Sequence, residues 1–236
     1  MIAQARLVEV ATGLEAYLCA QVGCVVVTKE ASALHQGIAQ TFDTTTDVLE
    51  GARRLASWLS LDVPARGLPT GQEYLSNFAT TIGRTIALPR AWRAPTGALQ
   101  RILILPHEAL HVHQYERGVD MGWYPKVTTH SVLYLASIAG GDGAEYVGHI
   151  EADAYATTEA VRTWLGGTRR PIGDITDSLR RHYALAGVGV VVAEAALISH
   201  YRSMSLGGLP NVRICRLSIE WLEANAPDLK GKVFQP

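Results

Sequence analysis

Two histidines and a glutamate in the middle of the chain have the types and spacing of a metal site. They are His107, Glu108 and His111, which form the pattern HExxH with Ala109 and Leu110. On a helix that rises about 1.5 Å per residue, the two histidines share one face about 6 Å apart, so both imidazoles can bind one ion. Glu108 is one step around the helix, within reach of a metal-bound water. The pattern therefore predicts a zinc ion, Zn²⁺, held by His107 and His111, with Glu108 as the general base.

A zinc site that hydrolyses a substrate needs a third protein ligand and leaves a fourth position open for water. The extended pattern HExxHxxGxxH requires glycine at 114 and histidine at 117, and HExxHxxH requires histidine at 114. The chain has Gln114 and Arg117 at these positions. His113 lies about 200° around the helix from His111 and faces elsewhere. The third ligand is therefore expected from another segment.

Residues 145–156 form the helical segment that offers this ligand, and its apolar side indicates which residues point inward. At about 100° per residue, the apolar side centres on Ile150, and a strip with His149 and Asp153 adjoins it. The far side, expected to face solvent, carries Glu151, Tyr155, Thr158, Glu159 and Arg162. We therefore predict His149 as the third ligand; Glu151 is the alternative, and a site without a third protein ligand is left open. Asp153 is expected to orient a ligating imidazole by a hydrogen bond.

The segment His107–Gln114, followed by a helix with Glu151–Ala156 (EADAYA), resembles the gluzincin type of zincin metallopeptidase. In that family a glutamate four residues before the aspartate is the third zinc ligand, and the aspartate supports a ligating histidine. In this chain the position four residues before Asp153 is His149. The resemblance covers about 50 residues. It implies a zinc-dependent metallopeptidase that cleaves a peptide or protein substrate with metal-activated water.

A second function fits the same residues. A non-catalytic zincin-like module could keep part of the metal site and serve as a structural or assembly component with a protein assembly partner. A peptidase, in contrast, also needs a donor for the oxyanion that forms at the substrate carbonyl. The candidates are His130, Tyr124, Tyr146 and Tyr155, and the sequence does not rank them.

Most of the chain is expected to be helical, because apolar residues recur at spacings of three and four. The helices are expected at about 7–18, 48–59, 127–138, 144–165, 174–201 and 212–225. The alternating segment Thr80–Leu88 predicts one half-buried strand. Pro106 either kinks a long helix or lies in the first turn of a new one.

These elements predict an α+β, predominantly α-helical fold, a zincin-like domain with a small β-sheet over the helix of the HExxH pattern. A single domain is expected over 1–236. It comprises a helical scaffold with an edge strand (1–95), a metal-site core (96–166) and C-terminal helices (167–236).

Composition limits the class of protein. The 236 residues are 48% hydrophobic and 18% charged, with a net charge of -1, which excludes a disordered chain and gives no basic patch for nucleic acid. The 3 cysteines are unevenly spaced and indicate no disulfide framework. The most apolar stretch, 184–198, is shorter than the roughly 20 residues that cross a bilayer. No membrane span and no signal peptide are expected, and a cytoplasmic location follows as the default.

Overall fold

The structure, a computed structural model, describes residues 2–41, 70–117, 144–182 and 187–234. Over these residues the fold is mainly helical with a small sheet, which confirms the expected α+β class. The longer helices are α1 (Gln4–Val22), α5 (Ala98–Arg117), α7 (Ala144–Trp164), α8 (Ile172–His182), α9 (Val188–Ser205) and α10 (Arg213–Asn225). The short helices are α3 (Gly71–Asn77) and α4 (Arg90–Arg93), and the strands are β1 (Val25–Thr28), β2 (Thr80–Ile82) and β3 (Thr85–Leu88). The helices expected at 48–59 and 127–138 lie outside the described residues.

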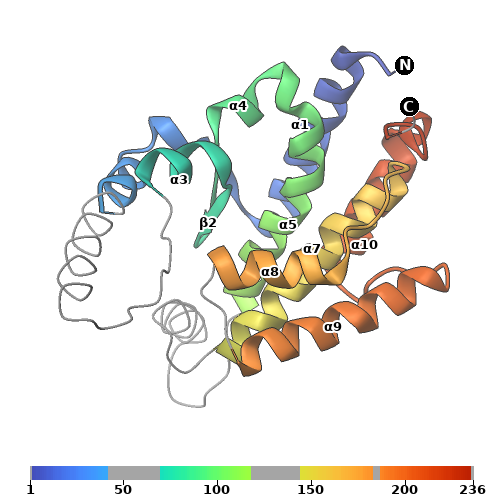
Figure 1. The fold of residues 1–236 in the computed structure, drawn as a ribbon. Helices are drawn as coiled ribbons and strands as arrows, with labels where there is room; N and C mark the ends of the chain where they lie inside the picture. Colours follow the sequence, from blue (N-terminus) through green and yellow to red (C-terminus); the bar gives the residue numbers. More distant parts are fainter. Residues whose placement is uncertain (1, 42–69, 118–143, 183–186, 235–236) are drawn as a thin grey trace.

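Helix α5 lies between the two halves of the fold (Figure 1), with β2 and α3 on one side and α7, α8 and α9 on the other. Its buried side chains pack against α1, α7 and α10 in the larger of two apolar cores. The helix is continuous through Pro106, so this proline lies inside one long helix and not in the first turn of a new one. Because proline has no N–H, the carbonyl of Ile102 lacks its usual helical partner, one turn before the HExxH residues.

The sheet has the order β1-β3-β2, with β1 parallel to β3 and β2 antiparallel to it. The prediction of one strand over Thr80–Leu88 is wrong, because the chain reverses within the segment and forms a hairpin. Gly83 makes the turn with a φ of 58°, a left-handed conformation that glycine adopts without a steric penalty. Strand β1 was not predicted. The hairpin brings β2 against α5, where Thr81 meets Glu108.

Helices α7 and α9 run side by side (Figure 1) and enclose the second apolar core together with α8. Their backbones approach closely at Gly148, where an added Cβ would lie 2.3 Å from the carbonyl oxygen of Gly189. The prediction of one helix over 174–201 is wrong, since α8 ends at His182 and α9 begins at Val188. Within the described ranges, no helix is both long enough and apolar enough to cross a membrane.

Candidate metal centre

Three side chains from α5 and α7 converge in the interior. His107 and His111 on α5 and Glu151 on α7 have ligand atoms that all lie within 4.8 Å of one another. Nε2 of His107 is 3.8 Å from Oε2 of Glu151, and Nε2 of His111 is 3.5 Å from Oε1. The two imidazole rings meet edge to face with their centroids 4.8 Å apart. The HExxH spacing thus places both rings on one side of the helix, and a carboxylate from the neighbouring helix faces them.

Two histidines and one glutamate are a donor set that zinc hydrolases use. Zinc bonds to nitrogen and oxygen are about 2.0–2.2 Å long, so tetrahedral ligand atoms are separated by roughly 3.3 Å. The two histidine-to-glutamate separations of 3.5 and 3.8 Å exceed this value by a few tenths of an ångström, and all three ligand atoms lie within 4.8 Å of one another. The residues therefore fit a zinc ion once their side chains move closer together.

Hydrogen bonds at Nδ1 leave Nε2 of both imidazoles directed at the centre. His111 Nδ1 lies 2.9 Å from Oε1 of Gln114, and because a side-chain amide oxygen only accepts, this nitrogen carries the proton. Gln114 in turn donates from Nε2 to the carbonyl of Ile150 over 3.2 Å and so links α5 to α7. His111 is thereby fixed in the tautomer whose Nε2 has a free lone pair for a metal.

His107 is fixed in a similar way from α7. Its Nδ1 lies 3.3 Å from Oγ1 of Thr158, whose hydroxyl donates to the carbonyl of Ala154 and is left to accept from the imidazole. The ring also packs edge-on against Tyr155, with centroids 5.1 Å apart. Burial lowers the pKa of His107 well below its usual range, and the nearby His111 and Arg170 lower it further. His107 is therefore neutral near pH 7, as a metal ligand must be.

Glu108 lies beside the three converging side chains and is held by strand β2. Oγ1 of Thr81 donates a 2.6 Å hydrogen bond to its Oε2. Burial raises the pKa of the Glu108 carboxyl, while the electrostatic effects of His111, the hydrogen bond from Thr81 and the charge of Lys29 oppose the rise. A carboxyl whose pKa moves toward neutral pH suits a general base.

Lys29 stabilises the segment that leads into β2. The side chain is fully buried, and Nζ donates to the carbonyls of Tyr74 (2.8 Å) and Phe78 (3.1 Å) and to Oγ1 of Thr80 (2.7 Å). Burial lowers the pKa of Lys29 to about 7. The lysine therefore fixes the residue before Thr81 and adds positive charge near the Glu108 carboxylate.

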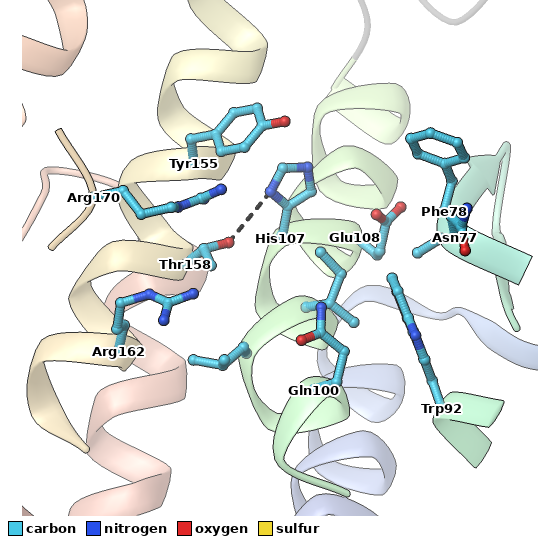
Figure 2. A pocket seen from close by; sticks show the side chains of 13 residues that line it. Asn77, Phe78, Trp92, Gln100, His107, Glu108, Tyr155, Thr158, Arg162 and Arg170 are labelled. Carbon is cyan, nitrogen blue, oxygen red and sulfur yellow. Dashed lines mark hydrogen bonds between the residues drawn. The ribbon is translucent and has the colours of Figure 1, made fainter. Parts of the chain in front are cut away.

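A cavity of about 220 Å³ opens beside His107 and Glu108 (Figure 2). One wall comes from α7 and the segment after it, with Tyr155, Thr158, Arg162 and Arg170. The facing wall carries Asn77, Phe78 and Trp92. The histidine and glutamate of the HExxH pattern thus border a space that admits a small group.

The predicted orientation of the 145–156 helix is wrong. His149 is exposed to solvent, whereas the alternative ligand Glu151 is fully buried and faces the histidines. Asp153 does not contact an imidazole of α5; its Oδ1 is 2.8 Å from Nε2 of His200 on α9. The side of α7 that was expected to face solvent is the side that faces the centre.

The four candidate oxyanion donors differ in whether the structure places them at the cavity. Tyr155 lines the cavity, and burial raises its pKa to about 12, so its hydroxyl remains protonated. Tyr146 does not line the cavity. Tyr124 and His130 lie outside the described residues.

Sequence reasoning missed several residues that shape the centre. Gln114 had a usable signal, because a residue three positions after His111 lies on the same helix face. Thr81 and Lys29 had none, since their roles depend on which strand packs against α5. The apolar pattern of the 145–156 segment predicts Arg162 on the solvent side, whereas in the structure Arg162 lines the cavity.

Comparisons of this chain with protein-family models, curated proteins and solved structures find no match in any of the three.

Proposed function

We propose that this chain is a zinc-dependent metallopeptidase that uses His107, His111 and Glu151 as ligands and Glu108 as the general base. The observation that carries the proposal is the convergence of two imidazole nitrogens and one buried carboxylate on a point beside a second buried carboxylate. Structural zinc sites are closed by four protein ligands, whereas catalytic sites have three and an open position. The described residues offer three ligands and a neighbouring cavity, which favours catalysis over a structural role.

The roles of the residues follow from their positions. Zinc, when bound, supplies a Lewis acid that lowers the pKa of a coordinated water to about 7 and polarises a carbonyl oxygen. Thr81 occupies Oε2 of Glu108, and Oε1 is then the oxygen that takes the proton from the attacking water. Glu108 subsequently delivers this proton to the leaving amine of the peptide.

Tyr155 supplies a hydrogen-bond donor, its hydroxyl, on the side of His107 away from Glu108 (Figure 2). Its pKa of about 12 keeps the O–H protonated at neutral pH, so it can stabilise negative charge on the substrate oxygen. Its ring also packs against His107 and limits the movement of that ligand.

The first experiment measures zinc content and affinity in wild type, Glu151→Gln and His149→Ala. His149 is the matched control, because it lies on the same helix and is exposed. We expect stoichiometric zinc in wild type and His149→Ala, and a large loss of affinity in Glu151→Gln. Loss of zinc from His149→Ala with full retention in Glu151→Gln would contradict the ligand assignment.

The second experiment measures cleavage of a mixed peptide library by zinc-loaded wild type and Glu108→Gln. We expect Glu108→Gln to keep its zinc and to lose about 10²- to 10⁴-fold in kcat, the usual contribution of a general base. If the wild type is fully loaded with zinc and cleaves no peptide, the alternative function, a zincin-like structural or assembly module, is the better description.

A further inference from the structure

One wall of the cavity beside the metal centre, opposite Asn77, Phe78 and Trp92, has two arginines but a single carboxylate to neutralise them. Arg162 on α7 and Arg170 after it both contact one carboxylate, that of Glu159, which is fully buried. Arg170 binds it through Nε at 2.7 Å and through its backbone N–H at 3.0 Å, and Nε of Arg162 is 3.4 Å away. Two guanidinium groups therefore share a single counter-charge, and one net positive charge remains at this wall.

The terminal nitrogens of both arginines are available to a ligand. Each guanidinium faces Glu159 with Nε, and neither Nη1 nor Nη2 of Arg162 or Arg170 hydrogen-bonds to another residue in the described part of the chain. Both side chains line the cavity, and in Figure 2 they extend from the α7 side toward His107. The closeness of Arg170 to the centre is also evident in its lowering of the His107 pKa.

Aromatic contacts hold both arginines in place. The guanidinium carbon of Arg170 is 5.2 Å from the centroid of the Tyr155 ring, and that of Arg162 is 5.5 Å from the Phe234 ring. The hydroxyl of Tyr201 donates to the carbonyl of Arg170 over 2.7 Å. A fixed planar guanidinium matches the two oxygens of a carboxylate and loses little side-chain entropy when it binds.

We propose that this cavity is a carboxylate subsite, in which Arg162 and Arg170 bind an acidic group of the peptide next to the bond that is cleaved. The inference rests on the proposed peptidase function. The cavity volume of about 220 Å³ gives room for one substrate side chain or chain end. The carboxylate belongs either to an aspartate or glutamate side chain or to a free C-terminus.

The test compares matched peptides on the zinc-loaded wild type. One arm uses C-terminally amidated peptides that differ only in Glu against Gln next to the cleaved bond. The other arm uses neutral peptides that end in a free acid or an amide at the same distance. If the subsite binds an acidic side chain, the Glu peptide should have a kcat/KM about 10- to 100-fold higher than the Gln peptide, because a charge-assisted hydrogen bond contributes this much. If it binds a free C-terminus, the same increase should appear for the free acid over the amide.

Arginine variants test whether the preference comes from this wall. We expect Arg162→Gln to reduce the preference for the acidic peptide to about 1, by lowering kcat/KM more for the acidic member of the pair than for the neutral one. Arg169→Gln is the control, because Arg169 bonds to Tyr201 and Ser205 outside the cavity. If Arg162→Gln fails to fold, Arg162→Lys replaces it; this variant keeps the charge, loses the two-pronged geometry and should retain only part of the preference.

Failure of this inference differs from failure of the proposed function. Cleavage that depends on Glu108 but shows no acid preference in either arm would overturn the carboxylate subsite and leave the peptidase. If no peptide is cleaved, N-acetylglutamate and its counterpart without a carboxylate, N-acetylglutaminamide, are titrated into the metal-free protein. If N-acetylglutamate binds more tightly than the probe without a carboxylate, and Arg162→Gln abolishes the difference, the subsite is supported without the peptidase. If the two probes bind equally and no peptide is cleaved, both the subsite and the peptidase are overturned.

Discussion

Replacement of Thr81 by valine tests how strand β2 controls the general base. Valine keeps the shape and the preference for β-structure but removes the hydroxyl that donates to Glu108 over 2.6 Å. An O–H donor this close to a carboxylate makes a charge-assisted bond, which contributes about 1.5–3 kcal/mol. If the bond orients Glu108 in the transition state, kcat/KM falls by about 10- to 100-fold. Zinc binding stays intact, because Thr81 contacts none of the three ligands.

The pH dependence separates this effect from general damage. The Thr81 hydroxyl stabilises the charged form of Glu108, so its loss raises the pKa of a carboxyl that burial already raises. The base is then protonated up to a higher pH, and the acidic limb of the kcat/KM profile moves toward alkaline pH. Part of the lost activity returns above that limb.

The assay is kcat/KM from pH 5 to 9 on one peptide, with zinc content measured in parallel. Thr81→Ser keeps a hydroxyl and should restore most of the activity and the wild-type pH profile. Thr85→Val, the same change on strand β3, controls for altered sheet packing. Wild-type kcat/KM and an unmoved acidic limb in zinc-loaded Thr81→Val would refute a positioning role for the hydroxyl.

Three further predictions concern packing, a buried charge and ligand support. Gly148→Ala should destabilise the protein by about 1–3 kcal/mol, because the added Cβ would lie 2.3 Å from a backbone carbonyl oxygen. Gly37→Ala, in a helical segment with open space around it, should instead stabilise the protein by roughly 0.5–1 kcal/mol. Thermal unfolding of both variants measures these changes, and equal effects of the two substitutions would contradict the prediction. For Lys29, the folded pKa of about 7 is below the usual value of 10.5, so the unfolded chain binds more protons between these pH values. Wild-type stability relative to Lys29→Met should therefore rise by on the order of 2–3 kcal/mol from pH 7 to 9.5 in urea unfolding of the metal-free proteins, and a constant difference would disprove the assignment. Gln114→Ala should weaken zinc binding by about 10- to 100-fold in a competition titration, while Asp153→Asn should leave it unchanged; a reversed order would contradict the roles assigned to these residues.

The sequence predicted those features that depend on contacts within one helix. The HExxH spacing determines that His107 and His111 share a face, because residues four apart on a helix are neighbours. The buried face of α1 and the bounds of α7 follow from the same periodicity. The hairpin at Gly83 was missed because strand alternation continues across a tight turn, and β1 was missed because four residues are too few to give a periodic signal.

The orientation of α7 could not be read from its apolar side, because α7 is buried on more than one side. Val147 and Ile150, which set the predicted orientation, pack with residues of α8 and α9. Ala154 and Val161 belong instead to the other core, which includes α5. A helix between two cores has no single inward face, so apolar residues alone do not indicate which side meets the metal ligands.

The polar residues of α7 give the better indication of its orientation. Glu151, Tyr155, Thr158 and Arg162 are spaced at four, three and four residues, which places them in one stripe along the helix. In the structure this stripe faces His107 and the cavity. A step of two residues turns the helix by about 200°, so a Glu151 that faces α5 forces both His149 and Asp153 away from it. One rotation of the helix therefore accounts for the exposure of His149 and for the bond of Asp153 to His200 on α9.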